Sequence, residues 1–384
     1  MRDLFLLDPA ITFLNHGSYG ACPREVIETQ QRWQLEMERN PVEFLARRSA
    51  TLLAEAREKL ARFVGADAAD LAFVPNATTG VNTVARSLAL QPGDEVLSND
   101  HEYGACEATF RIVCAERGAV LRRVAIALPF ERTGFADRVL AAATPRTKLI
   151  LVSHITSVTA LTFPVAELCA KARERGILTL VDGAHAPGQI DLDLRAVGAD
   201  FYTGNCHKWL CAPKGAAFLH ARPEHHARVH APVISWGYAA EVSGHTGFDA
   251  YTGKTTLERR LQWQGTRDIA AWLTVPAAIA FQARHDWPAV RARCHTLAAQ
   301  TLHRFADRFG LEPIGGDDDY VQMVTLPVPH RDGEALRARL WDESRIEVPV
   351  TQFGGRSFVR ISVQGYNTAE DIERLWAAPA LAAG

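Results

Sequence analysis

The sequence predicts an α/β protein with a large domain, whose mostly parallel sheet is flanked by helices, and a smaller α+β domain. Short apolar runs alternate with helical patterns from about residue 71 to residue 185, which is typical of parallel βαβ units. Two of these runs, KLILV and ILTLV, are apolar on both faces, as expected for a sheet covered by helices on both sides. The chain has 384 residues, which exceeds the size at which a single core usually stops growing.

The expected elements follow in order along the chain. Pro23 stands at a first-turn position before the helical pattern REVIETQQRWQLEMER, and a second helix is expected from about Phe44 to Val64. Strands are expected at LAFVP, EVLSN, AVLRRVAI, KLILVSHI and ILTLVDGAH, with helices between them. Beyond about Asp268 the pattern predicts a long helical stretch through Arg308, then VQMVTLPVP, a helix at GEALRARLW, strands around IEVPV and SFVRISV, and a last helix at AEDIERLWA. We therefore expect an N-terminal segment at 1–20, a large domain at 21–270 and a small domain at 271–384.

Charge, apolar runs and cysteine spacing argue against several classes of function. A formal charge of −2 and a pI near 6.7 provide no electrostatic basis for binding nucleic acid or an anionic membrane surface. No apolar run approaches the ~20 residues of a membrane helix, and Asp3 and Asp8 interrupt the stretch that a signal peptide would need, so the N-terminus reads as mature protein. The seven cysteines show no C-x-x-C spacing, which indicates neither a disulfide framework nor a zinc site and favours the cytoplasm: Cys22, Cys106, Cys114, Cys169, Cys206, Cys211 and Cys294.

The most informative segment covers residues 180–215. Asp182 and His185 follow one strand candidate, and Asn205, His207 and Lys208 follow the next. An aspartate at the end of a buried apolar strand is unfavourable unless a cation compensates it. The protonated pyridine nitrogen of pyridoxal phosphate would be such a cation, and Lys208 would supply the amine for a Schiff base, with a pKa lowered by desolvation. Taken alone, the aspartate could be a turn residue and the lysine a surface group; their occurrence one strand unit apart favours the cofactor.

A phosphate would need convergent amides and hydroxyls. The segment NATTGVN, residues 76–82, follows the strand LAFVP and opens a helix. The amides of Ala77 and Thr78 and the Thr78 hydroxyl would then point at an anion at the positive end of that helix. The alternative is that Asn76 or Thr78 merely caps the helix.

These segments resemble the class V aminotransferase family of fold-type I pyridoxal-phosphate enzymes, and within it the isopenicillin N epimerase-like branch. The resemblance covers nearly the whole chain, and the motifs are specific as an ordered set and not singly. They are FLNHGSYGACP, NPVEFLARR, NATTGVN, DHEYGA, VSHITSVTAL, VDGAHAPGQ, TGNCHKW, QGTRD and VRISVQGYNT.

The resemblance implies a role for each matching cofactor residue. Lys208 binds pyridoxal phosphate, Asp182 pairs with the pyridine nitrogen, and His185 lies near the phenolic oxygen. Tyr103 matches the aromatic position that stacks on the ring, where related cysteine desulfurases carry a histidine. The phosphate cradle matches Ala77, Thr78, Asn205 and His207.

The resemblance also implies the remaining site residues. Thr266 matches the residue that a neighbouring subunit offers to the phosphate, which implies a homodimer. Arg360 matches the arginine that clamps the substrate α-carboxylate through a bidentate pair. Asn15, His16 and Ser18, in the N-terminal segment, are expected to line the substrate pocket.

Two departures from the family pattern bear on the reaction. A cysteine desulfurase needs a nucleophilic cysteine shortly before the carboxylate-binding arginine, but residues 346–360 contain none. Where many relatives carry an asparagine facing the cofactor oxygen, this chain has Ser157.

Several outcomes remain open for an amino-acid substrate, with Lys208 as general base. Epimerisation and carbon–sulfur β-elimination rank closely, followed by transamination or oxidative deamination. Epimerisation would need an acid opposite Lys208, for which Tyr103 and His16 are candidates. A metal-dependent hydrolase built on Asp182, His185 and His207 is disfavoured because no H-x-x-x-H spacing occurs, and a non-enzymatic role is disfavoured because Lys208, Asp182 and Arg360 are all present.

Overall fold

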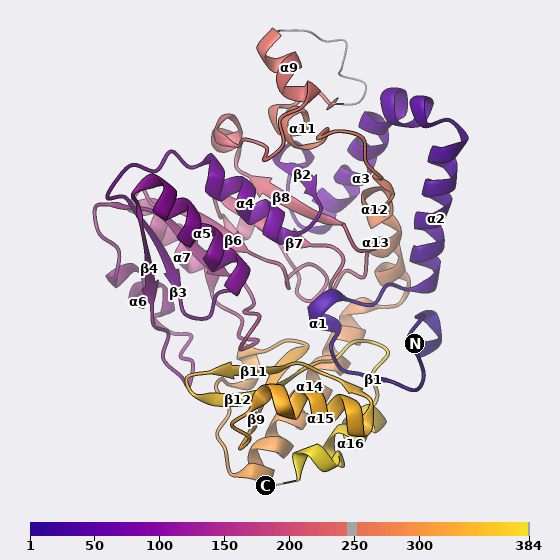
Figure 1. Ribbon diagram of the computed structural model, residues 1–384, viewed down its shortest axis with the longest axis vertical. Helices are drawn as coiled ribbons and strands as arrows, with labels where there is room; N and C mark the ends of the chain where they lie inside the picture. Colours follow the sequence, from indigo (N-terminus) through magenta and orange to yellow (C-terminus); the bar gives the residue numbers. More distant parts are fainter. Residues whose placement is uncertain (244–251, 383–384) are drawn as a thin grey trace.

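The computed structural model describes residues 1–243 and 252–382. Its centre is a seven-stranded sheet in the order β2-β8-β7-β6-β5-β3-β4 (Figure 1). Only β8 pairs antiparallel to its neighbours, so the predicted mostly parallel sheet is confirmed. The strands are β2 (Leu71–Val74), β3 (Glu95–Asn99), β4 (Val120–Val124), β5 (Thr147–Ser153), β6 (Leu178–Asp182), β7 (Phe201–Asn205) and β8 (Ala217–Ala221).

The two sheet faces carry different helices. In β5, Leu149 and Leu151 pack into one core with α4 and α5, whereas Ile150 and Val152 pack into the other with α3, α6 and α7. Successive side chains of a strand point to opposite faces, so both faces of this strand are buried, as its sequence predicted. These helices are α3 (Ser49–Phe63), α4 (Ala77–Ser87), α5 (Gly104–Arg117), α6 (Phe135–Ala141) and α7 (Val165–Glu174).

Other helical segments surround this core. The helix expected after Pro23 is α2, and the second expected helix begins as a π-helical turn, η2, before α3. A capping box with Thr255 and Glu258 starts α11. The bounds are η1 (Arg2–Leu4), α1 (His16–Tyr19), α2 (Arg24–Arg39), η2 (Glu43–Arg48), η3 (Ala68–Asp70), α8 (Leu194–Val197), η4 (Pro223–Arg228), α9 (Trp236–Ser243) and α11 (Thr256–Leu261).

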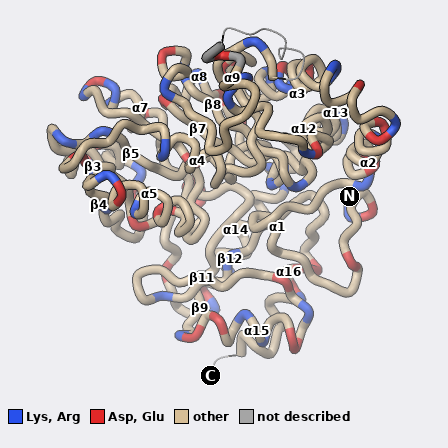
Figure 2. The backbone as a smooth tube through the Cα atoms, turned by 45° about the horizontal axis from the view of Figure 1, so that its top comes forward, with Lys and Arg blue, Asp and Glu red and all other residues tan. Residues whose placement is uncertain are grey.

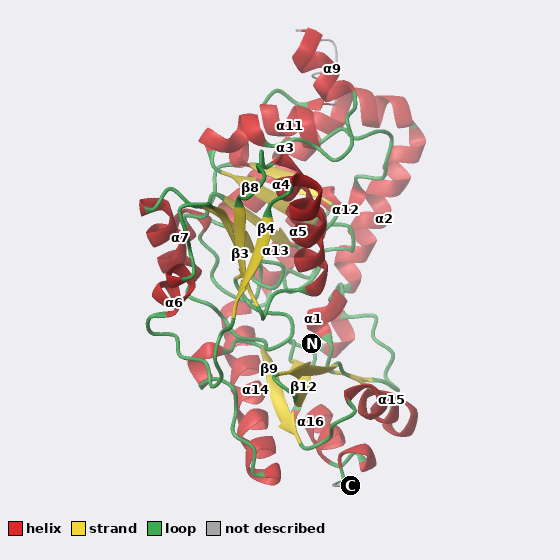
Figure 3. Cartoon of the chain, turned by 60° about the vertical axis from the view of Figure 1, so that its left-hand side comes forward, coloured by secondary structure: helices red, strands yellow, loops and turns green. Residues whose placement is uncertain are grey.

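The C-terminal part is built on a three-stranded antiparallel sheet in the order β11-β12-β9, of which Figure 3 labels β9 and β12. The N-terminal strand β1 pairs in parallel with β10, so the first residues of the chain are tied to this part. The elements are β1 (Thr12–Phe13), α12 (Ala270–Leu273), α13 (Val275–Arg284), α14 (Trp287–Phe309), η5 (Asp317–Asp319), β9 (Met323–Val328), α15 (Gly333–Ser344), β10 (Ile346–Glu347), β11 (Val350–Phe353), β12 (Arg356–Ser362), α16 (Ala369–Trp376) and η6 (Pro379–Leu381).

Two expectations differ from the structure here. The long helical stretch expected from Asp268 to Arg308 is divided into α12, α13 and α14, because Pro276 and Pro288 start new helices and Asp286 has a φ of 45° between them. The expected domain boundary at residue 270 falls inside α12, and α12 and α13 pack against α2 and α3. We therefore propose that the small domain begins at α14.

The charges of the molecule are mixed over its surface. Figure 2 shows lysine and arginine interspersed with aspartate and glutamate around the described chain. Within the described residues no helix combines the length and apolarity required to cross a bilayer.

Candidate active site

A cavity of about 340 Å³ lies where the loops after several strands of the large sheet meet. Ligands of open parallel sheets bind at the carboxyl ends of the strands, so this is the place that the topology favours. Most of the predicted site residues line this cavity: Ser18, Ala77, Thr78, Tyr103, Ser157, Asp182, His185, Asn205, His207 and Lys208. Asn15, His16, Thr266 and Arg360 do not line it.

Lys208 lies in the loop after β7, partly buried beside His185. Its Nζ is 3.2 Å from Nε2 of His185, while the indole N–H of Trp209 donates to Nδ1 of the same ring at 3.2 Å. Because Nδ1 accepts that bond, the neutral ring carries its proton on Nε2, facing the cavity. Burial, followed by the charge of Arg360, lowers the pKa of Lys208 to about 8, and burial holds the pKa of His185 well below its usual value. The lysine is therefore far closer to a free amine than an exposed lysine is.

Asp182 ends β6 and is 4% exposed. One carboxylate oxygen accepts the amide of Ala184 at 3.0 Å, and the other accepts the thiol of Cys106 at 3.2 Å. No described basic side chain lies within ion-pairing distance of it, and burial raises its pKa. A buried carboxylate with spare acceptor capacity and no described cation within ion-pairing distance fits the protonated pyridine nitrogen of pyridoxal phosphate.

The N-terminus of α4 faces the same cavity. Asn76 caps the helix through the Thr79 amide at 2.8 Å, and the Ala77 amide donates to Oδ1 of Asn205 at 2.8 Å. The Ala77 amide is therefore already hydrogen-bonded to Asn205, whereas we expected it to donate to a phosphate. Within the described residues, the Thr78 amide and hydroxyl have no hydrogen-bond partner, so they are the donors left for an anion at this helix end.

The ring of His207 can accept a hydrogen bond at the cavity but cannot donate one. Its Nδ1 donates to the carbonyl of Ala216 at 3.0 Å, and burial lowers the pKa of the ring to about 4. A neutral ring in this tautomer has a lone pair on Nε2, which accepts a hydrogen bond and does not donate one. His207 therefore suits a phosphate that carries a proton, whereas Nδ2 of Asn205 remains a donor.

Arg360 lies on β12, beside the cavity, and is 4% exposed. Its guanidinium donates to the carbonyl and to the hydroxyl of Ser157, and to the Ser18 hydroxyl at 3.2 Å, while its Nε has no partner. Burial lowers its pKa to about 10. No described carboxylate forms an ion pair with Arg360. An unpaired buried cation of this kind fits a substrate carboxylate, and Ser157 serves to position it.

His16 lies behind Lys208 and is fully buried. Its Nδ1 receives the Ala21 amide at 3.2 Å and the Tyr366 hydroxyl at 2.9 Å, so its proton is on Nε2, which donates to the backbone carbonyl of Lys208 at 3.0 Å. Burial lowers its pKa to about 3. Asn15 does not line the cavity either, and its side-chain amide donates to Glu347 at 3.2 Å. Of the three N-terminal candidates, Ser18 alone lines the cavity, and His16 supports the lysine loop.

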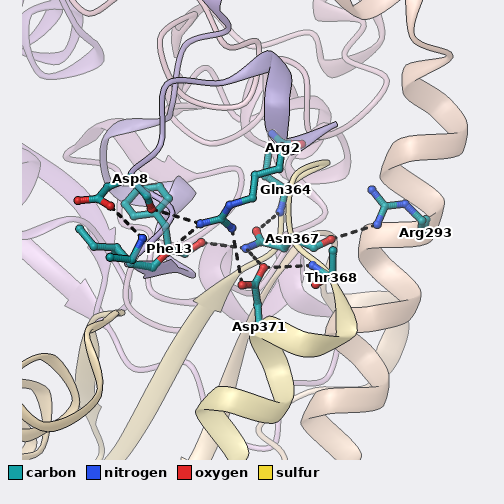
Figure 4. A network of polar contacts seen from close by, with 10 residues as sticks. Arg2, Asp8, Phe13, Arg293, Gln364, Asn367, Thr368 and Asp371 are labelled. Atoms are coloured by element: carbon teal, nitrogen blue, oxygen red, sulfur yellow. Dashed lines mark hydrogen bonds and ion pairs between the residues drawn. The ribbon is translucent and has the colours of Figure 1, made fainter.

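A polar network ties this N-terminal segment to the small domain (Figure 4). Asn367 donates to the carbonyl of Phe13 at 2.9 Å and to Asp371 at 3.1 Å, and it accepts the Gln364 amide at 2.9 Å. Arg2 donates to the carbonyl of Ile11 at 2.9 Å. The Gln364 side chain in turn contacts His16, so the network continues to the loop that carries Lys208.

Thr266 lies in the exposed loop between α11 and α12, away from the cavity of its own chain. Two residues that the sequence analysis did not select also contact the site. The Cys106 thiol donates a hydrogen bond to Asp182. The buried Glu102 carboxylate accepts the hydroxyl of Ser153, which lines the cavity. The signal for Glu102 was present, because a glutamate stands immediately before Tyr103 in the short loop that follows the buried strand β3. Within the described residues, no group of three or more His, Cys, Asp or Glu side chains could hold a metal ion.

Comparison with known proteins agrees with this geometry. The sequence model of the Aminotransferase class-V family matches residues 13–375. The chain is 41% identical to an isopenicillin N epimerase of Amycolatopsis lactamdurans, over 97% of this chain and 96% of the relative. It is 40% identical to the Streptomyces clavuligerus enzyme of that name, over 97% and 95%, and 28% identical to an L-cysteine desulfhydrase of Arabidopsis thaliana, over 94% and 86%.

Solved structures show the same fold. The cystine C–S lyase C-DES, solved with its product cysteine persulfide, superimposes with a TM-score of 0.82 at 22% identity, over 97% of this chain and 98% of the lyase. A cysteine desulfurase from Escherichia coli gives 0.79 at 22% identity, over 98% and 96%. The chain belongs to the class V aminotransferase family, and it is a pyridoxal-phosphate enzyme that acts at Cα or Cβ of an amino acid.

Proposed function

We propose that this chain is an amino-acid epimerase that inverts Cα of a substrate similar to isopenicillin N. The observation that carries the proposal is the level of identity, which is 41% and 40% to two isopenicillin N epimerases and 28% to 30% to the desulfhydrases. The site supports it with the amine of Lys208 in the cavity and the buried cation of Arg360, which has no ion-pair partner among the described residues, beside it.

The residues present fit pyridoxal phosphate. Lys208 would hold it through a Schiff base, Asp182 would pair with the ring nitrogen, and Nε2–H of His185, which now contacts Nζ of Lys208, would donate to the phenolic oxygen. Thr78 and Asn205 would hold the phosphate, and Tyr103, 46% exposed at the cavity, is available to stack on the ring. When bound, this cofactor acts as an electron sink that makes the Cα–H of an amino acid acidic.

The chain's own groups then bind the substrate and move the proton. Arg360 would hold the α-carboxylate with its free N–H groups, which orients Cα. The Lys208 amine, with its lowered pKa, would take the proton from Cα as general base. Because His185 contacts Nζ at 3.2 Å, it limits where the free amine points.

Carbon–sulfur β-elimination is the second candidate, supported by the desulfhydrase relatives. A desulfurase mechanism is not supported: residues 346–360 contain no cysteine, and all seven cysteines are buried. Burial raises the thiol pKa of Cys106, which donates to Asp182, and of Cys206 and Cys211, which flank Lys208 in the sequence, and this disfavours the thiolate. β-Elimination needs no protein thiol, so this finding does not weigh against it.

We also propose a homodimer in which Thr266 of each subunit reaches the phosphate of the other. Thr266 is exposed and does not line the cavity of its own chain, which supports this arrangement. A cytoplasmic location is proposed with it, supported by the seven unpaired cysteines.

The test is incubation of the holoenzyme in deuterated water with isopenicillin N and, separately, with L-cysteine. Inverted product carrying deuterium at Cα supports the epimerase, and pyruvate with sulfide from L-cysteine indicates the lyase. Lys208→Ala is the control and should do neither. Keto acid formation without inversion or sulfide would instead indicate transamination or oxidative deamination.

A further inference from the structure

A second carboxylate, that of Glu102, is buried beside Asp182 and has no place in the chemistry described so far. Glu102 is 5% exposed and lies in the loop after β3, immediately before Tyr103. Its Oε1 accepts the backbone amide of Ser153 at 2.8 Å and the side-chain amide of Asn99, and its Oε2 shares a hydrogen bond of 2.6 Å with the Ser153 hydroxyl. These donors offset part of the cost of burying a charged carboxylate.

Ser153 links this carboxylate to the cofactor site. It is the last residue of β5, it pairs in register with Asp182 on β6, and it lines the cavity. When Glu102 is ionised, the Ser153 hydroxyl donates to it and turns its oxygen lone pairs to the cavity. When Glu102 is protonated, it donates to Ser153, whose own proton then becomes free to point at the cavity. The protonation state of Glu102 therefore decides whether Ser153 presents a proton or its oxygen lone pairs to the cavity.

No described basic side chain compensates the charge of Glu102. The titratable groups that act on it from neighbouring elements are Asp182 on β6 and the thiol of Cys106 on α5, and neither is basic. None of the described lysine, arginine or histidine side chains forms an ion pair with it, and the adjacent His101 is turned to Thr159. Burial, with a smaller contribution from the Asp182 charge, raises the pKa of Glu102 to about 7.

We propose that Glu102 is a positioning residue for the ring nitrogen of the cofactor: its carboxylate places a second negative charge behind Asp182 and helps to hold the proton on that nitrogen. The inference rests on the proposed pairing of Asp182 with the nitrogen. Two like charges in a buried site destabilise each other, and a cation placed against one of them relieves both. The second charge therefore strengthens the electron sink without touching the cofactor.

The test is a pH titration of the ring nitrogen of the bound cofactor, followed by nitrogen NMR of cofactor labelled at that atom, in Glu102→Gln, which keeps the shape of the side chain and removes the charge. Loss of a negative neighbour lowers the pKa of a protonated group, so the titration should move to lower pH by about one unit, a tenfold change in proton affinity. The two proteins should converge as the pH falls through the pKa of Glu102, where the wild-type side chain is also neutral. The matched control is Glu116→Gln, the same charge change at a half-exposed position on α5, which should leave the titration in place.

An unchanged titration in Glu102→Gln, or an equal shift in Glu116→Gln, overturns the inference. If Glu102→Gln cannot be recovered folded, Ser153→Ala retains the carboxylate and removes one donor to it. The titration must then move in the same direction by less than one unit, and no movement again overturns the inference. A wild-type protein without any visible band would instead refute the proposed cofactor site itself, so the two failures are distinguishable.

Discussion

The attachment of the cofactor should depend on pH in a way that an ordinary lysine would not show. The unprotonated amine is the nucleophile that attacks the cofactor aldehyde. Burial, followed by the charge of Arg360, lowers the pKa of Lys208 from 10.5 to about 8. At pH 7 roughly 10% of such a side chain is neutral, against roughly 0.03% at the ordinary pKa, so the environment raises the reactive fraction about 300-fold.

The perturbation is Arg360→Gln, which removes the nearby positive charge. A cation disfavours protonation of a neighbouring amine, so its removal should raise the pKa of Lys208 and move the midpoint of the rate profile to higher pH by about half to one unit. The matched control is Arg356→Gln. Arg356 begins the same strand, but its guanidinium donates outward to the carbonyl of Glu312, so the midpoint should stay in place.

The assay mixes apoenzyme with pyridoxal 5'-phosphate and follows the visible absorbance over time between about pH 6 and about pH 10, a range that spans the lowered pKa. Borohydride trapping and peptide mapping confirm that Lys208 is the modified residue. The rate should level off above the lowered pKa. A rate that still rises tenfold for each pH unit up to the ordinary lysine pKa would refute the electrostatic argument, and so would equal behaviour of the two arginine variants.

Three other predictions follow from contacts in the site. Asp182→Asn should lower kcat by about 10²- to 10⁴-fold, since loss of one partner from a buried charge pair costs about 3–5 kcal/mol; an unchanged kcat in steady-state assays would contradict its pairing role. Arg360→Lys should raise KM about tenfold with a smaller change in kcat, because the charge remains and the bidentate fork is lost. Gly80→Ala should lower the free energy of unfolding in urea by about 1–3 kcal/mol, because its Cβ would lie 2.2 Å from Oγ1 of Thr203. Gly104→Ala, with nothing within 4 Å of the new Cβ, is its control and should not destabilise the protein.

The periodic elements were predictable because their signal is local. The strands KLILV and ILTLV became β5 and β6, and their alternating residues divide between two cores. The strand β8 was missed. Its five residues carry the short apolar pattern AFLHA, which does not differ from a loop or a helix end until it pairs with β2 and β7. The long helical stretch is divided because Pro276 and Pro288 each start a new helix. Hydrophobic periodicity alone does not detect such breaks.

The sequence by itself determined the kind of chemistry, because motif order and strand ends place Asp182 and Lys208 at one edge of a parallel sheet. Tertiary structure alone decided how each polar group is used. In the folded chain His16 donates to the backbone carbonyl of Lys208, and the Ala77 amide donates to Asn205. Glu102 is buried beside Asp182. The physical reason is that hydrogen-bond partners and desolvation depend on side chains from distant segments, and these meet only when the chain packs.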